Sequence, residues 1–169
     1  MSAKFDAADY VLPLHGTSTL SLSPLTASDA EWLSLPIAAM DPWAAYGYPA
    51  SALQRMLAAV EPGAPRLSLS LDGTVVGAAV IRTAWLRGPY LQFFAVLPDA
   101  QGRGVGAAFL SWMEREARAA DERNLWVVAS QINTGAIRFY QRHGFTHIAD
   151  LDDLAYDGRT EFLFRKRIV

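Results

Sequence analysis

The chain has 169 residues, the length of one ordinary domain, and 51% of them are hydrophobic while 19% are charged. Its net charge of −2 argues against a nucleic-acid-binding surface, because such domains are usually clearly basic. The absence of cysteine excludes disulfides, thiolate zinc sites and a cysteine nucleophile. The three histidines are spread along the chain, so we predict no metal site.

The first ten residues contain neither the basic segment nor the apolar stretch of a secretory signal. No apolar run approaches the ~18 residues that a membrane-spanning helix needs. We therefore expect a cytoplasmic protein without membrane contacts.

We expect residues 1–18 to form an N-terminal arm and residues 19–169 to form a single domain. Apolar and polar residues alternate over 19–25, which predicts a half-buried strand. Ser28 stands three residues before Glu31, which is the spacing of a capping box, and predicts that a helix begins there.

The segment 41–49 is rich in aromatic residues, proline and glycine and predicts a loop, and 51–60 predicts a second helix. Residues 67–71 and 74–82 flank Asp72-Gly73, a dipeptide that favours a two-residue turn. This is the strongest hairpin signal in the chain.

Residues 90–97 are almost all apolar, which is typical of a strand buried on both faces. A glycine-rich segment over 98–106 leads into a helical pattern over 105–120, and 125–129 predicts another buried strand. A strand, a crossover helix and a strand form a right-handed parallel unit.

A further helix is predicted over 133–143, ended by Gly144. Two final strands, 145–156 and 160–168, are joined by a turn at Asp157-Gly158. The predicted fold class is α/β (α+β): a mixed, mostly antiparallel central sheet with one parallel β-α-β unit and flanking helices.

The glycines at 102, 104 and 106 lie between a buried strand and a helix. The first amides of a helix lack partners and carry a partial positive charge, so glycines there favour a phosphate site. Arg103 adds a positive charge at its rim. A tight turn without a ligand is the alternative. A dinucleotide site is a second alternative, although four residues, 98–101, separate the strand from the first glycine.

Two motifs in this order resemble the GNAT superfamily of acyl-CoA-dependent N-acetyltransferases. The first is Val96-Leu97-Pro98 followed by Gln101-Gly102-Arg103-Gly104-Val105-Gly106, and the second is Asn133-x-x-Ala136-x-x-x-Tyr140-x-x-x-Gly144-Phe145. The resemblance covers about nine tenths of the chain and implies a GNAT-like fold and acetyl-CoA as the acyl donor, with no metal.

Carried over by position, the resemblance implies that residues 101–106 hold the pyrophosphate of acetyl-CoA. Phe94, Ala95 and Val96 would pair their backbone with the pantetheine arm where the strands 90–97 and 125–129 separate. A backbone N–H near Val96 or Leu97 would polarise the thioester carbonyl. Asn133 would bind the cofactor from the start of its helix, or serve as an ordinary N-cap, and the two roles are compatible.

Tyr140 is the candidate general acid, because a phenol is protonated at neutral pH and can donate to the departing thiolate. In the alternative, its ring only packs against the sheet. Many members of the family carry an acidic residue on the strand that matches 90–96, but Gln92 and Phe93 cannot take a proton. Asp41, Glu31 or a chain of waters could replace that base, unless these carboxylates are simply solvated or capping groups.

Trp43, Tyr46, Tyr48 and Trp85, with Gln92, are the candidate acceptor pocket, with Trp85 in the loop after the hairpin. In the alternative, these rings pack the helices onto the sheet. The expected partner is a small-molecule or protein amine, and a homodimer is possible. The expected activity is direct acetyl transfer in a ternary complex. The alternative activities are a non-catalytic acyl-CoA sensor and, more weakly, a nucleotide-dependent oxidoreductase.

Overall fold

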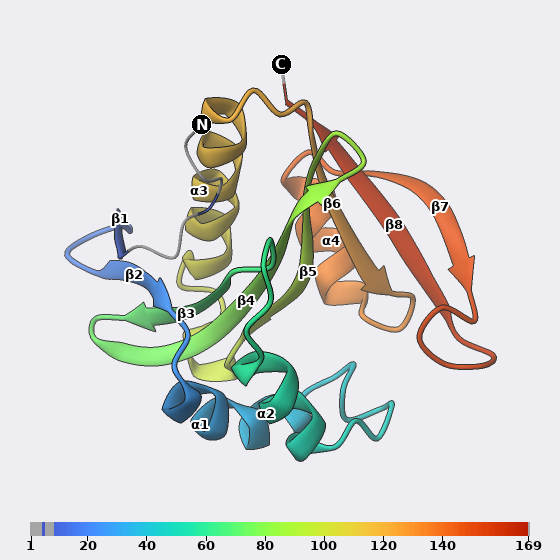
Figure 1. Cartoon of the computed structure of the whole chain (residues 1–169), viewed down its shortest axis with the longest axis horizontal. Helices are drawn as coiled ribbons and strands as arrows, with labels where there is room; N and C mark the ends of the chain where they lie inside the picture. Colours follow the sequence, from blue (N-terminus) through green and yellow to red (C-terminus); the bar gives the residue numbers. More distant parts are fainter. Residues whose placement is uncertain (1–4, 6–8, 169) are drawn as a thin grey trace.

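One sheet of eight strands runs through the protein (Figure 1). Its strands are β1 (Tyr10–Pro13), β2 (Thr19–Pro24), β3 (Arg66–Leu71), β4 (Thr74–Trp85), β5 (Gly88–Val96), β6 (Asn124–Ser130), β7 (Thr146–Asp152) and β8 (Thr160–Arg167). The computed structural model describes residues 5 and 9–168. The strand order is β1-β2-β3-β4-β5-β6-β8-β7, and of its neighbouring pairs β5 and β6 are parallel while the others are antiparallel. The predicted mixed sheet with one parallel unit is therefore confirmed.

The helices cover both faces of the sheet. They are α1 (Ala27–Ala38), α2 (Ala50–Ala58), α3 (Val105–Ala119) and α4 (Thr134–Arg142), with a 3-10 turn, η1 (Pro98–Ala100), before α3. α1 and α2 lie beside each other below the sheet in Figure 1, whereas α3 and α4 belong to the opposite face. No helix in the described part of the chain is long and apolar enough to cross a membrane.

Side chains of β4 alternate between two hydrophobic cores. Ala78 and Val80 join the core beneath α1 and α2, while Ala79 and Ile81 join the core beneath α3 and α4. A strand with both faces covered has apolar residues at successive positions, which explains the apolar run over 78–81 in β4.

A β-bulge interrupts β5 at Gln92. Two consecutive residues of β4 pair with Phe93 and Leu91, so that Gln92 between them is an extra residue. The pairing of β5 with β6 is limited to Tyr90 and Leu91, immediately before the bulge. The two parallel strands then separate, as the resemblance implied. Gln92 is also exposed, so β5 is not buried at every position as predicted.

Three predicted boundaries are wrong. Residues 10–13, expected to belong to an irregular arm, form β1, which pairs with β2; residues 1–4 and 6–8 of that arm lie outside the described residues. Trp85 ends β4 instead of lying in a loop, because the hairpin is longer than its apolar pattern. β7 ends at Asp152, so the β7–β8 connection is a loop over 153–159 rather than a two-residue turn.

The capping box of α1 lies two residues before the predicted one. Thr26 accepts a hydrogen bond from the amide of Asp29 (3.1 Å), and the Asp29 carboxylate accepts one from the amide of Thr26 (3.1 Å). The same carboxylate accepts a hydrogen bond from Ser68 of β3 at 2.7 Å. The sequence fits both spacings, and the pair that also anchors α1 to the sheet forms the cap.

Replacing Asp29 by alanine should therefore lower the free energy of unfolding at pH 7 by about 1 kcal/mol, the usual value of a cap. Burial raises the pKa of Asp29, but the hydrogen bonds from Ser68 and Thr26 outweigh it and hold the pKa below 3.8. The stabilisation is present above pH 3.8 and is lost as the pH falls through the lower folded-state pKa. Urea unfolding at several pH values measures both effects. Ser28→Ala, at the predicted cap, should change neither; an equal loss in both variants would contradict this account.

Candidate active site

The separation of β5 and β6 opens onto a groove of about 530 Å³. One wall is the end of β5 with the loop 101–107, and the other is α4 along its whole length. Phe94, Ala95 and Val96 line it, together with five members of the glycine-rich loop, Gln101, Gly102, Gly104, Val105 and Gly106. The structure thus brings together most of the predicted cofactor residues.

Gly104 sets the geometry of the loop. It is the N-cap of α3 and has a left-handed backbone (φ 84°), and no side chain caps the first amides of the helix. Uncapped amides at a helix start favour an anion. Gly106 has a different role, because a Cβ there would lie 2.9 Å from the ring of Phe139. It permits α3 and α4 to approach each other.

The two side chains of the loop already have partners. Gln101 donates from Nε2 to the Val96 carbonyl oxygen (2.8 Å), so its amide lies over the end of β5. Arg103 forms an ion pair with Asp72 of the β3–β4 turn (3.6 Å), with both side chains about half exposed, and does not line the groove. The predicted positive charge at the rim is therefore partly neutralised.

The backbone of β5 presents alternate residues to the gap. The Leu97 amide donates to the Val76 carbonyl of β4 (2.7 Å), which removes it as a donor to a thioester. Because backbone groups alternate in direction along an antiparallel pair, those of Phe94 and Val96 point away from β4, and those of Ala95 point toward it. Val96 is thus the available donor, and Ala95 contributes its side chain rather than its backbone.

Asn133 and Tyr140 belong to α4 and line the groove. Asn133 is the N-cap, and its Oδ1 accepts a hydrogen bond from the Ala136 amide (3.1 Å). Tyr140 is buried between the rings of Phe139 and Phe145. Its burial, with a smaller effect of nearby Tyr90, raises the pKa of Tyr140 far above its ordinary value, so the phenol keeps its proton at neutral pH.

A second cavity of about 290 Å³ adjoins the groove. Five residues line both cavities: Trp43, Phe94, Asn133, Ala136 and Tyr140. Tyr140 therefore lies where the two spaces meet. The predicted acceptor residues Tyr46, Tyr48 and Gln92 line this second cavity, but Trp85 lines neither; it packs on Tyr90 at 5.3 Å. Trp85 belongs to the far end of β4.

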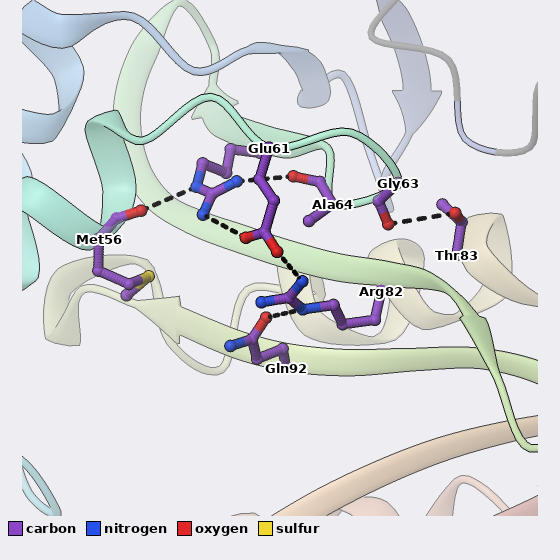
Figure 2. A network of polar contacts seen from close by, with 8 residues as sticks. Met56, Glu61, Gly63, Ala64, Arg82, Thr83 and Gln92 are labelled. Carbon is purple, nitrogen blue, oxygen red and sulfur yellow. Dashed lines mark hydrogen bonds and ion pairs between the residues drawn. The ribbon is translucent and has the colours of Figure 1, made fainter.

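The amide of Gln92 is held by a polar network (Figure 2). Arg82 of β4 donates from Nε to Gln92 Oε1 (2.7 Å) and forms an ion pair with Glu61. Glu61 also pairs with Arg66, which donates to the carbonyl of Met56 (2.8 Å). Gln92 therefore has an orienting partner, and it still offers no group that can take a proton.

The acidic residue of the second cavity is Glu161, which sequence reasoning missed. It is the second residue of β8, and its side chain is buried (6% exposed). It accepts a hydrogen bond from the Tyr46 hydroxyl at 2.8 Å. Since that proton goes to Glu161, Tyr46 accepts from Ser130 of β6 in a second, short hydrogen bond. Burial raises the pKa of Glu161, and the bond from Tyr46 opposes this shift. The only sequence signal was an acidic residue inside a predicted strand.

The other predicted groups lie elsewhere. Glu31 is exposed and lines neither cavity, and Asp41 lines only the larger one. Lys166 of β8 pairs with Glu114 of α3 (2.6 Å). His147 pairs with Asp150 (2.7 Å). In the described residues no three His, Asp or Glu side chains gather where they could share a metal ion.

Residues 28–145 match the sequence profile of the acetyltransferase (GNAT) family. The chain belongs to this family. A streptothricin acetyltransferase of Streptomyces lavendulae is 30% identical over 93 residues, which cover 54% of this chain and 49% of that protein. The chain thus matches about half the length of this relative.

Solved GNAT structures agree in fold. An acetyltransferase of Thermus thermophilus superposes with a TM-score of 0.67 at 25% identity, covering 88% of this chain and 97% of that one. A GNAT acetyltransferase of Elizabethkingia anophelis with acetyl-CoA bound has a TM-score of 0.56 at 15% identity, covering 63% of this chain and 77% of that one. The fold is thus one that binds acetyl-CoA in another protein.

Tyr46→Phe should raise the pKa of Glu161 further, because it removes the hydrogen bond that favours the carboxylate. A carbon-13 NMR titration of the glutamate carboxyl groups, assigned with Glu161→Gln, measures the shift. Tyr48→Phe is the matched control, since it lines the same cavity and should leave that pKa unchanged. A pKa that falls in Tyr46→Phe would contradict the described contact.

Proposed function

We propose that the protein transfers the acetyl group of acetyl-CoA directly to a primary amine of a small molecule or a protein, in a ternary complex. The observation that carries the proposal is the meeting of the two cavities at Tyr140. The larger space has the glycine-rich loop 101–107 at one end, and the smaller one is lined by polar and aromatic side chains. Donor and acceptor can then occupy separate spaces that share one wall.

The loop 101–107 would hold the pyrophosphate through the uncapped amides of α3, and the gap edge of β5 would pair with the pantetheine arm. The Val96 amide is the donor for the thioester carbonyl, where one preorganised hydrogen bond is worth ~3 kcal/mol. Asn133 caps α4 and lines the larger space, where it would contact the donor. Tyr140, a protonated phenol in an apolar setting, would protonate the departing thiolate. Acetyl-CoA supplies the acyl group and the thiol leaving group.

The main alternative is a non-catalytic acyl-CoA-binding protein. Such a protein would bind acyl-CoA in the same groove but would not transfer the acyl group. Calorimetry with acetyl-CoA, followed by assay of free CoA across a panel of amines, separates the two. Binding with turnover supports the transferase, and binding without turnover supports the sensor. The cytoplasmic location and a homodimer remain predictions from the sequence.

Gly104→Ala should weaken acetyl-CoA binding about tenfold. A left-handed backbone costs a non-glycine residue ~1–2 kcal/mol, and relief of this strain moves the amides that hold the anion. Calorimetric titration measures the affinity. Gly158→Ala is the matched control, because Gly158 is also left-handed (φ 73°) but lines neither cavity. Equal affinities in the two variants would count against the loop as the phosphate site.

Tyr140→Phe should slow CoA release about 10²-fold or more, because the variant loses the acid and keeps the packed ring. Acetyl-CoA affinity should stay near that of the wild type. Stopped-flow detection of the free thiol, with calorimetry on the same samples, measures both. An unchanged rate would show that another group or water protonates the thiolate.

A further inference from the structure

Glu161 is a buried carboxylate that lacks a cationic partner. Its polar contacts within the described residues amount to the hydrogen bond from Tyr46 at 2.8 Å, and no Lys, Arg or His lies within ion-pair distance there. Arg159 lies over the face of the Tyr46 ring at 5.6 Å. Buried charges in proteins are usually paired, so an unpaired one beside a cavity points to a ligand that completes it.

The residues that line the smaller cavity suit a positively charged group. Glu161 and the hydroxyl of Tyr46 lie on one side, and the rings of Trp43, Tyr48 and Tyr90 also line the space. A carboxylate among aromatic faces suits an alkylammonium, which gains both an ion pair and cation–π contacts. The same space reaches Tyr140, so a group bound there adjoins the proposed position of the thioester.

Resting on the proposed function, we propose that Glu161 binds the ammonium group of a primary alkylamine acceptor and takes the proton that the nitrogen must lose before it attacks. β5 has no carboxylate to offer, and its Gln92 is an amide tied to Arg82. β8 supplies it from the opposite side of the gap. The acceptor class is therefore a cationic primary amine rather than an alcohol, a thiol or an anionic compound.

The proton balance is complete without another reactant. One N–H proton of the alkylammonium passes to the Glu161 carboxylate, and the freed lone pair forms the C–N bond at the thioester carbon. The C–S bond breaks, its electron pair leaves with sulfur, and the phenol of Tyr140 protonates the thiolate. The nitrogen releases its second proton to the tyrosinate, and Glu161 returns its proton to water.

Burial, rather than a neighbouring charge, sets the direction of the pH effect at Glu161. Tyr46 donates to it, Tyr90 adjoins it, and Arg82 and Arg159 act on those two tyrosines rather than on Glu161 itself. Burial raises the pKa of Glu161 above that of an exposed glutamate. Its base form is lost as the pH falls through that raised value, so kcat/KM should decline on the acid side at a higher pH than an exposed carboxylate would cause.

The test compares wild type with Glu161→Gln, which keeps the size of the side chain and an oxygen for Tyr46. With an alkylamine, kcat/KM should fall about 10²-fold, and the acid limb of the pH profile should disappear. With trifluoroethylamine, which is already neutral at pH 7, the loss should be much smaller. Glu116→Gln, which changes a carboxylate of α3 that lines neither cavity, is the matched control and should leave all rates unchanged.

Stability separates this role from a structural one. A buried carboxylate with a raised pKa is disfavoured in its charged form, so Glu161→Gln should unfold at an equal or higher temperature than wild type at pH 7. A lower unfolding temperature with equal losses for both amines would make Glu161 an anchor for Tyr46 and overturn the proposal. Unchanged kinetics with both amines would overturn it as well.

A final measurement does not depend on turnover. Titrating the wild type with an alkylamine should lower the pKa of Glu161 by NMR, whereas a matched alcohol should not. If the pKa falls but no amine is acetylated, the ammonium site stands and the transferase function fails. If amines are acetylated but the pKa and Glu161→Gln show no effect, the function stands and the site fails.

Discussion

The extra residue in β5 at Gln92 is the constraint on which the rest of the site depends. It ends the pairing of β5 with β6 after Leu91, and it turns Phe94 and Val96 so that their backbone groups face the gap. Backbone amides and carbonyls need partners, and an open strand edge is satisfied by an added strand or by water. The amide of Gln101 covers one of these groups, the Val96 carbonyl. An extended ligand with its own amides complements the remainder.

The same bulge explains why one sheet carries two cavities. On one side of the gap, α3 and α4 meet closely because residue 106 has no side chain. On the other side, β6 and β8 stay paired along their whole length and place Ser130 and Glu161 opposite each other. The acid proposed for the leaving group therefore comes from a helix, and the base proposed for the amine comes from a strand. Neither requires the other to move.

Features that depend on neighbours in the sequence could be predicted. The hairpin at Asp72-Gly73, the crossover unit and the loop 101–106 each follow from local periodicity and turn chemistry, and the structure contains all three. Asn133 and Tyr140 lie seven residues apart on one helix, so a local motif was enough to bring them to one wall.

Features that depend on pairing across the sheet could not be predicted. The bulge is visible only in the register of β5 against β4, and the contact of Tyr46 with Glu161 joins residues 115 positions apart. The predicted cap of α1 was wrong for a different reason. The sequence has two pairs with the spacing of a capping box, 26/29 and 28/31. The hydrogen bond that Asp29 accepts from Ser68 distinguishes them, and it requires the helix to lie against β3.

In the proposed acceptor site, the carboxylate of Glu161 is unfavourably placed when the chain is considered alone. A carboxylate that is 6% exposed and holds one hydrogen bond is less stable there than in water. A second fixed cation would relieve that penalty, but it would also occupy the place of an ammonium ligand and lower the basicity of the carboxylate. Arg159 instead lies over the Tyr46 ring, where it supports the donor without neutralising Glu161. A protein that keeps such a carboxylate unpaired gives up some stability and retains a group of raised basicity, whose charge the proposed ammonium ligand would complete.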